Sequence, residues 1–555
     1  MSFHFTHCTT TSPSTFVTSV WSLHSVGVPP TQSRSVVHTK DTRGAPLVSL
    51  VHTSLCWSLY VSSRTPLPRE VGVFTIITPL CWCFCALSST AAPGHQGAGK
   101  RALYRACGRG KSRAAADVRE GCSAPVSQAG PKVLTGRESV SRGALGTANI
   151  GVRRSFTPGV SWPFCKRRCT YCNFNKYISP NVDHNAMRDG LVQETETLLR
   201  DSQVKEITSV FFGGGTPSLA KPSTIASILE TVAKASCLSH NVEVTLEANP
   251  TSVSTSKLAE FKKAGVTRIS IGIQALRNYD LKVLGRDHTV QEAVWSLEEA
   301  RKLYPGCTSV DIIFGRPGQS LELWEEELEE ILTLCDHHVS LYQLTLERGT
   351  ALFKQVQEKV VSMPEQDVVA NMYHAARSIL EKAGFHQYEV SNFAKNGAVS
   401  LHNLGYWKGM QYLGVGPGAH GRFVPWGEGK TQREARIQTL EPDNWLREVR
   451  QFGHGTRKRV QQSELDILEE MLVMGLRMNE GLAHQCWRQY SPLLGLEEAL
   501  GDSPEVQRYL QEELLILDDR GLRCSWKGLA FLDSLLPSLL HQLQHSYRNS
   551  ASHCF

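Results

Sequence analysis

Acidic residues are scarce in the first 150 positions of this chain, which hold 5 Asp and Glu against 15 Lys and Arg. The rest of the 555 residues hold 48 acidic and 44 basic residues, so the net charge of +6 arises from the N-terminal part. The larger part therefore lacks the clustered positive charge that nucleic-acid binding requires. We expect no nucleic-acid partner.

A long apolar run is also missing. The uncharged, apolar stretch at 71–87 has 17 positions and contains Pro79, whereas a membrane helix needs about 20. The sequence therefore predicts no transmembrane span.

The region 1–150 has little that would fold. It is rich in Ser, Thr, Pro and Gly and lacks sustained helical or strand periodicity, which predicts a disordered or atypical extension. Its acid-poor, Arg-containing segment 100–119 is typical of an import signal, so we expect a mitochondrial location. Since no methionine lies between Met1 and Met187, we also expect an alternative or mis-joined N-terminus.

The 16 cysteines lack the density of a small disulfide-rich secreted protein, which favours a reducing compartment. Three of them, Cys165, Cys169 and Cys172, fall within eight residues. Three thiolates can hold three irons of a 4Fe-4S cluster and leave the fourth open to a small molecule. A zinc site or a chance group of buried thiols is the alternative, but no second CxxC pair follows.

From residue 160 onward, apolar strand-like runs alternate with amphipathic helix-like segments. The run RISIGIQ at 268–274 and the segment STIASILETVAKAS at 223–236 represent the two kinds. Such βαβ repetition predicts an α/β fold with a parallel sheet, which right-handed crossovers can curl into a barrel.

This part of the chain resembles the radical S-adenosylmethionine (SAM) superfamily, in the branch of oxygen-independent coproporphyrinogen oxidases and HemW-type heme chaperones. The blocks that carry the resemblance after the cysteines are FFGGGTPS at 211–218, LEANP at 246–250, RISIGIQ with LGRDH at 268–288, VDIIFGRPGQ at 310–319, LYQLTLERGT at 341–350, GFHQYEVSNFA at 384–394, HNLGYW at 402–407 and YLGVGPGAH at 412–420. The resemblance implies a partial, six-stranded (β/α) barrel with its site at the C-terminal ends of the strands. We expect an N-terminal extension at 1–150, the barrel at 151–424 and a HemN/HemW-type C-terminal domain at 425–555.

The C-terminal part, from about residue 425, has helical apolar spacing at 465–478 and a hairpin-like turn in LDDRGLRC at 517–524, followed by a helix. This pattern predicts a winged-helix-like unit. Because the region lacks a clustered basic face, a lid over the barrel or a contact with a client protein is favoured over DNA binding.

One position separates the two sides of the family branch. The oxidases carry an additional cysteine two places after the triad, where this chain has Phe174. The resemblance therefore implies a heme chaperone that carries a 4Fe-4S cluster and SAM and passes heme to acceptor proteins, with an electron donor for the cluster. A radical SAM enzyme acting on a porphyrinogen, and an inactive isoform, are the alternatives.

The resemblance also implies a set of SAM-binding residues. They are Gly213, Gly214, Gly215, Thr216, Glu247, Gln274, Arg286 and Asp311. Consecutive glycines allow close approach of the backbone to the SAM amino group, Arg286 offers a planar fork to a carboxylate, and the carboxylates can accept hydrogen bonds. An ordinary glycine turn and solvated surface charges are the alternatives. The chemistry implied is reductive cleavage of SAM to methionine and a 5′-deoxyadenosyl radical.

The heme ligand stays open at this stage. His402 in HNLGYW and His420 in GAHGR are the first candidates, because imidazole is a common axial ligand of heme iron. Cys335, His337 and His338 are further candidates, and a lone histidine is more often structural.

Three positions depart from the family pattern. Gly159 and Ser161 stand where the family has a tyrosine and a histidine before the first cysteine, so the first barrel strand lacks its usual sequence. This departure motivates the inactive-isoform alternative, in which SAM binding is lost. Arg316 replaces an apolar residue, and we expect it to place an additional charge near Asp311.

Overall fold

The structure, a computed structural model, describes residues 155–202, 204–427 and 432–552. The predicted extension at 1–150, with its import-like segment and the apolar stretch at 71–87, lies outside the described residues. Within the described ranges, no helix is both long enough and apolar enough to cross a membrane.

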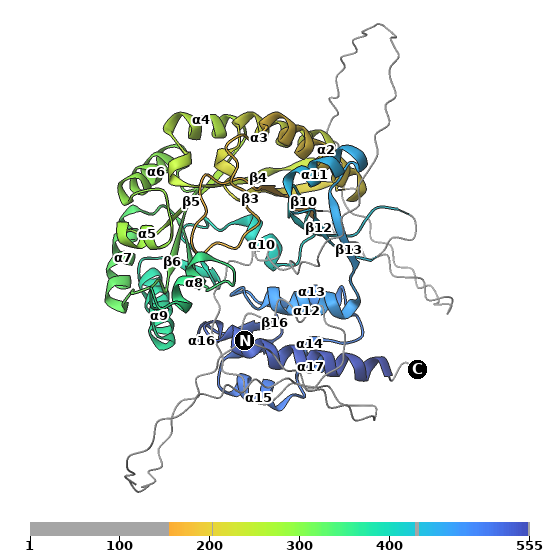
Figure 1. The fold of residues 1–555 in the computed structure, drawn as a ribbon. Coiled ribbons are helices and arrows are strands. Elements are labelled where there is room, and N and C mark those ends of the chain that lie inside the picture. The colour runs from red at the N-terminus through yellow and green to blue at the C-terminus, as the bar shows by residue number, and fades with distance from the viewer. Residues whose placement is uncertain (1–154, 203, 428–431, 553–555) are drawn as a thin grey trace, which may run out of the picture. The chain divides into compact units, whose positions relative to one another are not determined.

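The predicted α/β barrel is present (Figure 1). Six parallel strands follow one another in chain order, and helices lie around their outer side. The six strands are β2 (Gly159–Trp162), β3 (Glu206–Gly214), β4 (Cys237–Ala248), β5 (Arg268–Gln274), β6 (Thr308–Phe314) and β7 (His338–Gln343). The helices between and after them are α2 (His184–Ser202), α3 (Pro222–Ala235), α4 (Thr255–Lys263), α5 (Asn278–Val283), α6 (Val290–Leu303), α7 (Leu321–Leu334), α8 (Ala351–Gln357) and α9 (Gln366–Lys382), with 3-10 turns η2 (Pro217–Leu219) and η3 (Pro250–Ser252).

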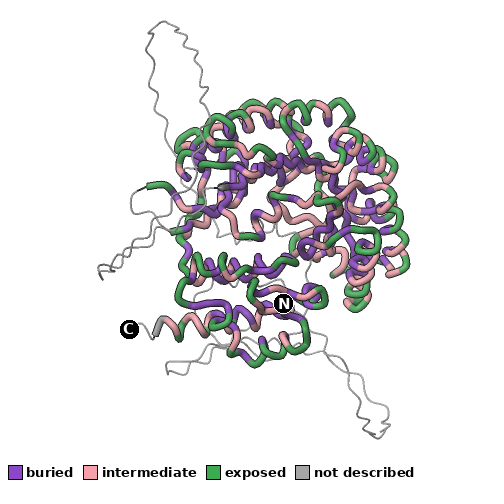
Figure 2. The backbone as a smooth tube through the Cα atoms, turned by 180° about the vertical axis from the view of Figure 1, so that it is seen from behind, coloured by how far each residue is buried: buried purple, intermediate pink, exposed green. Residues whose placement is uncertain are grey.

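Alternation along β5 shows how the sequence determines the two faces of the sheet. Ile269, Ile271 and Ile273 are buried in the main hydrophobic core. The intervening residues, among them Ser270 and Gln274, line an internal cavity, because successive side chains of a strand point to opposite faces. Figure 2 shows the strands as mostly buried and the outer sides of the helices as exposed. Apolar side chains therefore fill the layer between the sheet and the helices, and polar side chains line the barrel interior.

The first barrel strand forms despite its unusual sequence. β2 pairs in parallel with β3, with Gly159 opposite Phe211 and Ser161 opposite Gly213. Pairing uses backbone amides and carbonyls, so it does not depend on the missing tyrosine and histidine. The space beside Gly159 is not empty, since a Cβ there would lie 3.0 Å from the Tyr406 hydroxyl. The first strand, which the inactive-isoform alternative takes to be disrupted, is thus present.

Short strands extend the sheet at both edges. On one side β10 pairs in parallel with β2, and on the other β9 and β8 continue antiparallel from β7. A further short strand, β1, pairs with β3. The bounds are β1 (Ser155–Phe156), β8 (His386–Glu389), β9 (Asn392–Ala394) and β10 (Gly414–Val415), with α10 (Leu401–Trp407) before β10.

The C-terminal part contains two small antiparallel sheets, in the orders β11-β12-β13 and β14-β16-β15. The predicted hairpin is present, with Leu517 opposite Leu522, and α12 falls on the segment with helical apolar spacing. The strands are β11 (His420–Phe423), β12 (Glu434–Gln438), β13 (Thr456–Gln461), β14 (Leu482–Ala483), β15 (Leu515–Asp518) and β16 (Gly521–Cys524). The helices are α11 (Pro442–Phe452), α12 (Glu464–Gly475), α13 (His484–Arg488), α14 (Leu496–Leu500), α15 (Pro504–Gln511), α16 (Trp526–Leu529) and α17 (Leu532–Ser552).

A buried carboxylate fastens α2 to the segments that follow the barrel. Glu194 accepts hydrogen bonds from the backbone amides of Gly416 and Gly455, each at 2.6 Å, and from Trp445 Nε1 at 2.9 Å. All three partners are donors, so only an acceptor group satisfies them.

Glu194→Gln is therefore expected to lower the free energy of unfolding by about 2–3 kcal/mol, because the amide NH2 would face an N–H donor in a buried site. Urea-induced unfolding measures the loss. Glu196→Gln, at an exposed position of the same helix, is the control and should change stability by less than about 0.5 kcal/mol. Equal stability of the two variants would contradict the interpretation.

Candidate functional site

The cysteine loop follows β2 directly and is held by backbone hydrogen bonds to distant segments. The Thr170 amide donates to the Leu284 carbonyl at 3.0 Å, and the Leu352 amide donates to the Thr170 carbonyl at 2.9 Å. The Thr170 hydroxyl also donates to the Val283 carbonyl at 2.7 Å. These contacts fix the loop over the barrel independently of the cysteine side chains.

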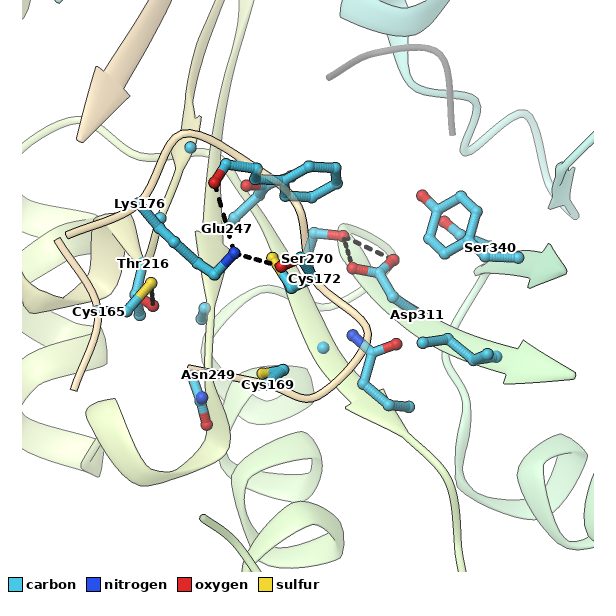
Figure 3. Close-up of a pocket in the computed structure, with 18 of the residues that line it drawn as sticks. Cys165, Cys169, Cys172, Lys176, Thr216, Glu247, Asn249, Ser270, Asp311 and Ser340 are labelled. Carbon is cyan, nitrogen blue, oxygen red and sulfur yellow. Dashed lines mark hydrogen bonds between the residues drawn. The ribbon is translucent and has the colours of Figure 1, made fainter. Parts of the chain in front are cut away.

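The loop borders a cavity of about 240 Å³ in the barrel interior. All three cysteines of the triad line it, together with side chains from the barrel strands (Figure 3). Of the sequence-predicted SAM residues, the cavity brings together Gly214, Gly215, Thr216, Glu247, Gln274, Arg286 and Asp311. Gly213 is the exception, since it is not among the residues lining the cavity.

The thiols surround a space and do not converge on a point. Within the described ranges, no three His, Cys, Asp or Glu side chains stand close enough to hold a single metal ion. A 4Fe-4S cube binds each thiolate at a separate iron, so ligands arranged around a shared cavity fit such a cluster.

Two of the thiols are strongly affected by burial. Burial raises the pKa of Cys165 to about 11, with further increases from Cys172 and Cys169, and burial also raises the pKa of Cys172. Such thiols are protonated at neutral pH, so binding of iron must release their protons. Thr216 offsets part of this cost at Cys165, because its hydroxyl donates to the Cys165 sulfur at 3.3 Å.

Arg286 contacts the second cysteine. Its Nη1 donates to the Cys169 sulfur at 3.4 Å, and its Nη2 donates to the Gly272 carbonyl at 2.8 Å. The planar fork expected to meet a SAM carboxylate is therefore turned toward a cluster ligand and the β5 backbone. Its role in SAM binding stays a prediction.

Asp311 lies on β6 and faces the cavity beside Ser340 (Figure 3). The Ser270 hydroxyl lies 3.0 Å from both carboxylate oxygens. Burial raises the pKa of Asp311 to about 6, against the lowering effect of the hydrogen bonds from Ser270 and Ser340. This carboxylate changes charge close to neutral pH.

Several buried polar atoms around the cavity have no hydrogen-bond partner within the described part of the chain. They include Gln274 Oε1, Arg286 Nε and Thr245 Oγ1. Gln274 also has a backbone φ of 73°, in the left-handed region that costs a non-glycine residue energy. Unsatisfied polar atoms and local strain at one cavity are typical of a binding site whose ligand supplies the missing contacts.

The glycines at the end of β3 serve the packing of the chain itself. A Cβ on Gly215 would lie 2.7 Å from the Pro163 carbonyl group, and Gly214 has φ 109°. The cysteine loop therefore passes against these glycines. Close packing of the chain is thus one reason for glycine at these positions. The approach of the glycines to the SAM amino group stays a prediction.

Arg316 does not act on Asp311 as expected. Its guanidinium is buried and pairs with Asp280 at 3.0 Å and with Glu327. It also donates to the Gln274 carbonyl at 3.4 Å. Arg316 is not among the residues lining the cavity, and its charge is neutralised by the two carboxylates, while its contact with the carbonyl helps hold the strained Gln274 backbone.

The two histidines predicted as heme ligands are not among the residues lining the cavity. His402 is fully buried on α10, with Nδ1 2.9 Å from the Ser209 hydroxyl and Nε2 3.0 Å from the Tyr406 hydroxyl. Both ring nitrogens are thus engaged within the chain. Burial lowers the pKa of His402 to about 3. Burial, together with the positive charges of Arg422 and Lys458, also lowers the pKa of His420, on β11, to about 3.

Some cavity residues were not anticipated from the sequence. Ser270 shares the inward face of β5 with Gln274, and Ser340 shares that of β7 with His338, which also lines the cavity. Strand alternation in RISIGIQ and HVSLYQ could have identified them. Contacts such as that of Lys176 with the Cys172 carbonyl carry no comparable sequence signal.

Comparisons with known proteins match this geometry. The Radical SAM superfamily description matches residues 160–331, and the HemN C-terminal domain description matches residues 462–531. These ranges fall inside the predicted barrel and C-terminal domains, whose exact limits stay predictions.

Two relatives and one solved structure illustrate the similarity. The zebrafish (Danio rerio) "Radical S-adenosyl methionine domain-containing protein 1, mitochondrial" is 60% identical over 385 residues, which cover 69% of this chain and 87% of the relative. "Heme chaperone HemW" of Bacillus subtilis is 32% identical over 322 residues, which cover 58% of this chain and 83% of the relative. The structure of coproporphyrinogen III oxidase (HemN) from Escherichia coli, a radical SAM enzyme, has a TM-score of 0.59 at 17% identity and covers 70% of this chain and 91% of its own, which shows the fold alone. The predicted fold and mitochondrial location are confirmed.

Proposed function

Because the chain belongs to the radical SAM superfamily, in the family of the mitochondrial radical S-adenosyl methionine domain-containing protein 1, we propose that it binds heme and passes it to acceptor proteins. The relative named as a heme chaperone supports this proposal. So does Phe174, which occupies the place of the additional oxidase cysteine.

The cavity supports a resident cofactor pair. Cys165, Cys169 and Cys172 would hold a 4Fe-4S cluster, and the partnerless atoms of Gln274 and Arg286 support a SAM site beside it. The chemistry that such a pair supplies is one-electron reductive cleavage of the SAM sulfonium, for which an electron donor is required.

The chain's own residues prepare the site for that pair. The Thr216 hydroxyl and the Arg286 guanidinium each donate to a cysteine sulfur, and such contacts stabilise thiolate charge and tune a cluster's potential. The observation that carries the cofactor proposal is the meeting of the three cysteines with the strand residues around one partly unsatisfied cavity.

The first test is a titration of heme into the anaerobically reconstituted full chain, followed by the Soret band. We expect saturable binding, and we expect the loaded protein to convert a heme-free globin to its heme form. Absence of saturable binding would remove the chaperone function. Production of 5′-deoxyadenosine in proportion to a consumed porphyrinogen would favour the enzyme alternative.

Asp311 gives the proposed SAM site a pH dependence. Its folded-state pKa of about 6 lies above the ordinary 3.8, so the carboxylate is charged above pH 6 and takes up a proton as the pH falls through 6. The affinity for SAM is expected to fall about tenfold between pH 7.5 and 5, because a hydrogen bond to a charged acceptor weakens. Calorimetric titration of SAM into the reconstituted protein measures this change.

Asp311→Asn should bind SAM more weakly at pH 7.5 and show a flat profile over the same range. Asp189→Asn, on the exposed side of α2, should retain the wild-type profile. A wild-type profile in the Asp311→Asn variant would contradict the assignment.

A further inference from the structure

A second hollow of about 630 Å³ lies next to the cysteine loop, and we name it the outer hollow. Trp162, Phe164, Cys165 and His184 are among the residues that line it. Its volume falls within the roughly 300–1,000 Å³ of small-molecule sites. The central cavity is smaller, at about 240 Å³, and is already assigned to the cluster and SAM.

Aromatic side chains form one wall of the outer hollow. The rings of Trp162 and His184 stack with centroids 5.4 Å apart, and Phe164 meets Trp162 edge-on at 5.5 Å. Trp162 Nε1 and His184 Nδ1 are buried and have no hydrogen-bond partner among the described residues. Such a wall suits a flat conjugated ligand, and a buried nitrogen without a partner is typical of a site that a ligand completes.

Three lysines lie at or near this wall. Lys166 lines the hollow, and Lys221 and Lys257 lie near enough to lower the pKa of His184, after the larger effect of burial. The Asp183 carboxylate opposes them, but it accepts hydrogen bonds from the first amides of α2. The hollow therefore favours a ligand that carries negative groups.

We propose that the outer hollow binds an anionic metallotetrapyrrole, with the ring plane against Phe164 and the carboxylate side chains toward the lysines. This inference rests on the proposed function, since it places the heme of a chaperone. His184 is the candidate iron ligand, because its side chain lines the hollow and its imidazole, whose pKa is lowered by burial and the nearby lysines, is neutral at pH 7. His402, in contrast, has both nitrogens engaged.

The test is a hemin titration of the full chain carrying His184→Ala or Lys221→Glu, followed by the Soret band. Each variant is expected to weaken binding about tenfold, and His184→Ala is also expected to shift the Soret maximum. Lys221 is exposed at the start of α3, so this variant keeps the test valid if His184→Ala fails to fold.

Two matched controls separate local from general effects. Lys234→Glu removes an exposed lysine at the other end of α3, and His240→Ala removes an exposed histidine on β4. Both should bind hemin within twofold of the wild type.

The outcomes distinguish this inference from the proposed function. If the wild type binds no hemin, the chaperone function fails. If the wild type binds hemin and both hollow variants bind it equally well, the proposed function survives, but the assignment of the heme site to the outer hollow is wrong. Loss of binding in His338→Ala alone would move the tetrapyrrole to the central cavity and would likewise overturn the inference.

Discussion

Replacing Cys169 with alanine is expected to abolish assembly of the iron–sulfur cluster while the barrel stays folded. The iron and sulfide content after anaerobic reconstitution should fall from about 4 of each per chain to background, because two thiolates cannot retain a cube that normally has three or four. The fold should survive, since the neighbouring Thr170 holds the loop through backbone contacts with Leu284 and Leu352. Circular dichroism checks that part of the prediction.

Cys237→Ala is the matched control, because Cys237 is exposed on β4 and is not among the residues lining the cavity. It should reconstitute like the wild type. Full iron and sulfide content in Cys169→Ala would show that the cluster has other ligands.

Replacing Arg316 with leucine, the kind of residue that the family carries there, is expected to destabilise this chain by about 3–5 kcal/mol. Arg316 is buried between the carboxylates of Asp280 and Glu327. Glu327 also accepts a hydrogen bond from the Leu276 amide at 2.6 Å. Without the guanidinium, two carboxylates would share a buried site with no cation, and their desolvation would no longer be offset.

Urea-induced unfolding of Arg316→Leu and Arg277→Leu provides the comparison. Arg277 pairs with Glu326 at the surface, so its loss should cost less than about 1 kcal/mol. Equal losses in the two variants would show that the buried pair contributes no more than the exposed one. The double variant Arg316→Leu with Glu327→Gln should recover part of the stability, because it removes one of the two uncompensated charges.

Much of the barrel could be predicted because its signals are local. The alternation in RISIGIQ determines both the strand and its two faces, and the motif blocks fall at strand ends that a parallel sheet brings together. The unusual side chains of the first strand do not prevent its formation, since β2 needs only its backbone to pair with β3.

The contacts that determine each site residue's role are not local. Arg286 meets Cys169, and His402 meets Ser209, across separations of 117 and 193 residues. No spacing rule connects such positions, so the sequence could indicate Arg286 as a SAM ligand and His402 as a heme ligand but could not show that other partners hold them. The additional charge at Arg316 was misplaced for the same reason, because Glu327 lies on the following helix.

Cys165 and Lys166 line both the central cavity and the outer hollow, so the cysteine loop forms a wall common to the two. Ligands on the two sides of one wall are thermodynamically linked through its position. If an assembled cluster tightens binding in the outer hollow by some factor, occupation of the outer hollow must strengthen retention of the cluster by the same factor. Such linkage makes heme loading depend on the presence of the cluster without the movement of a domain. Heme affinities measured with and without the cluster give the sign of this dependence.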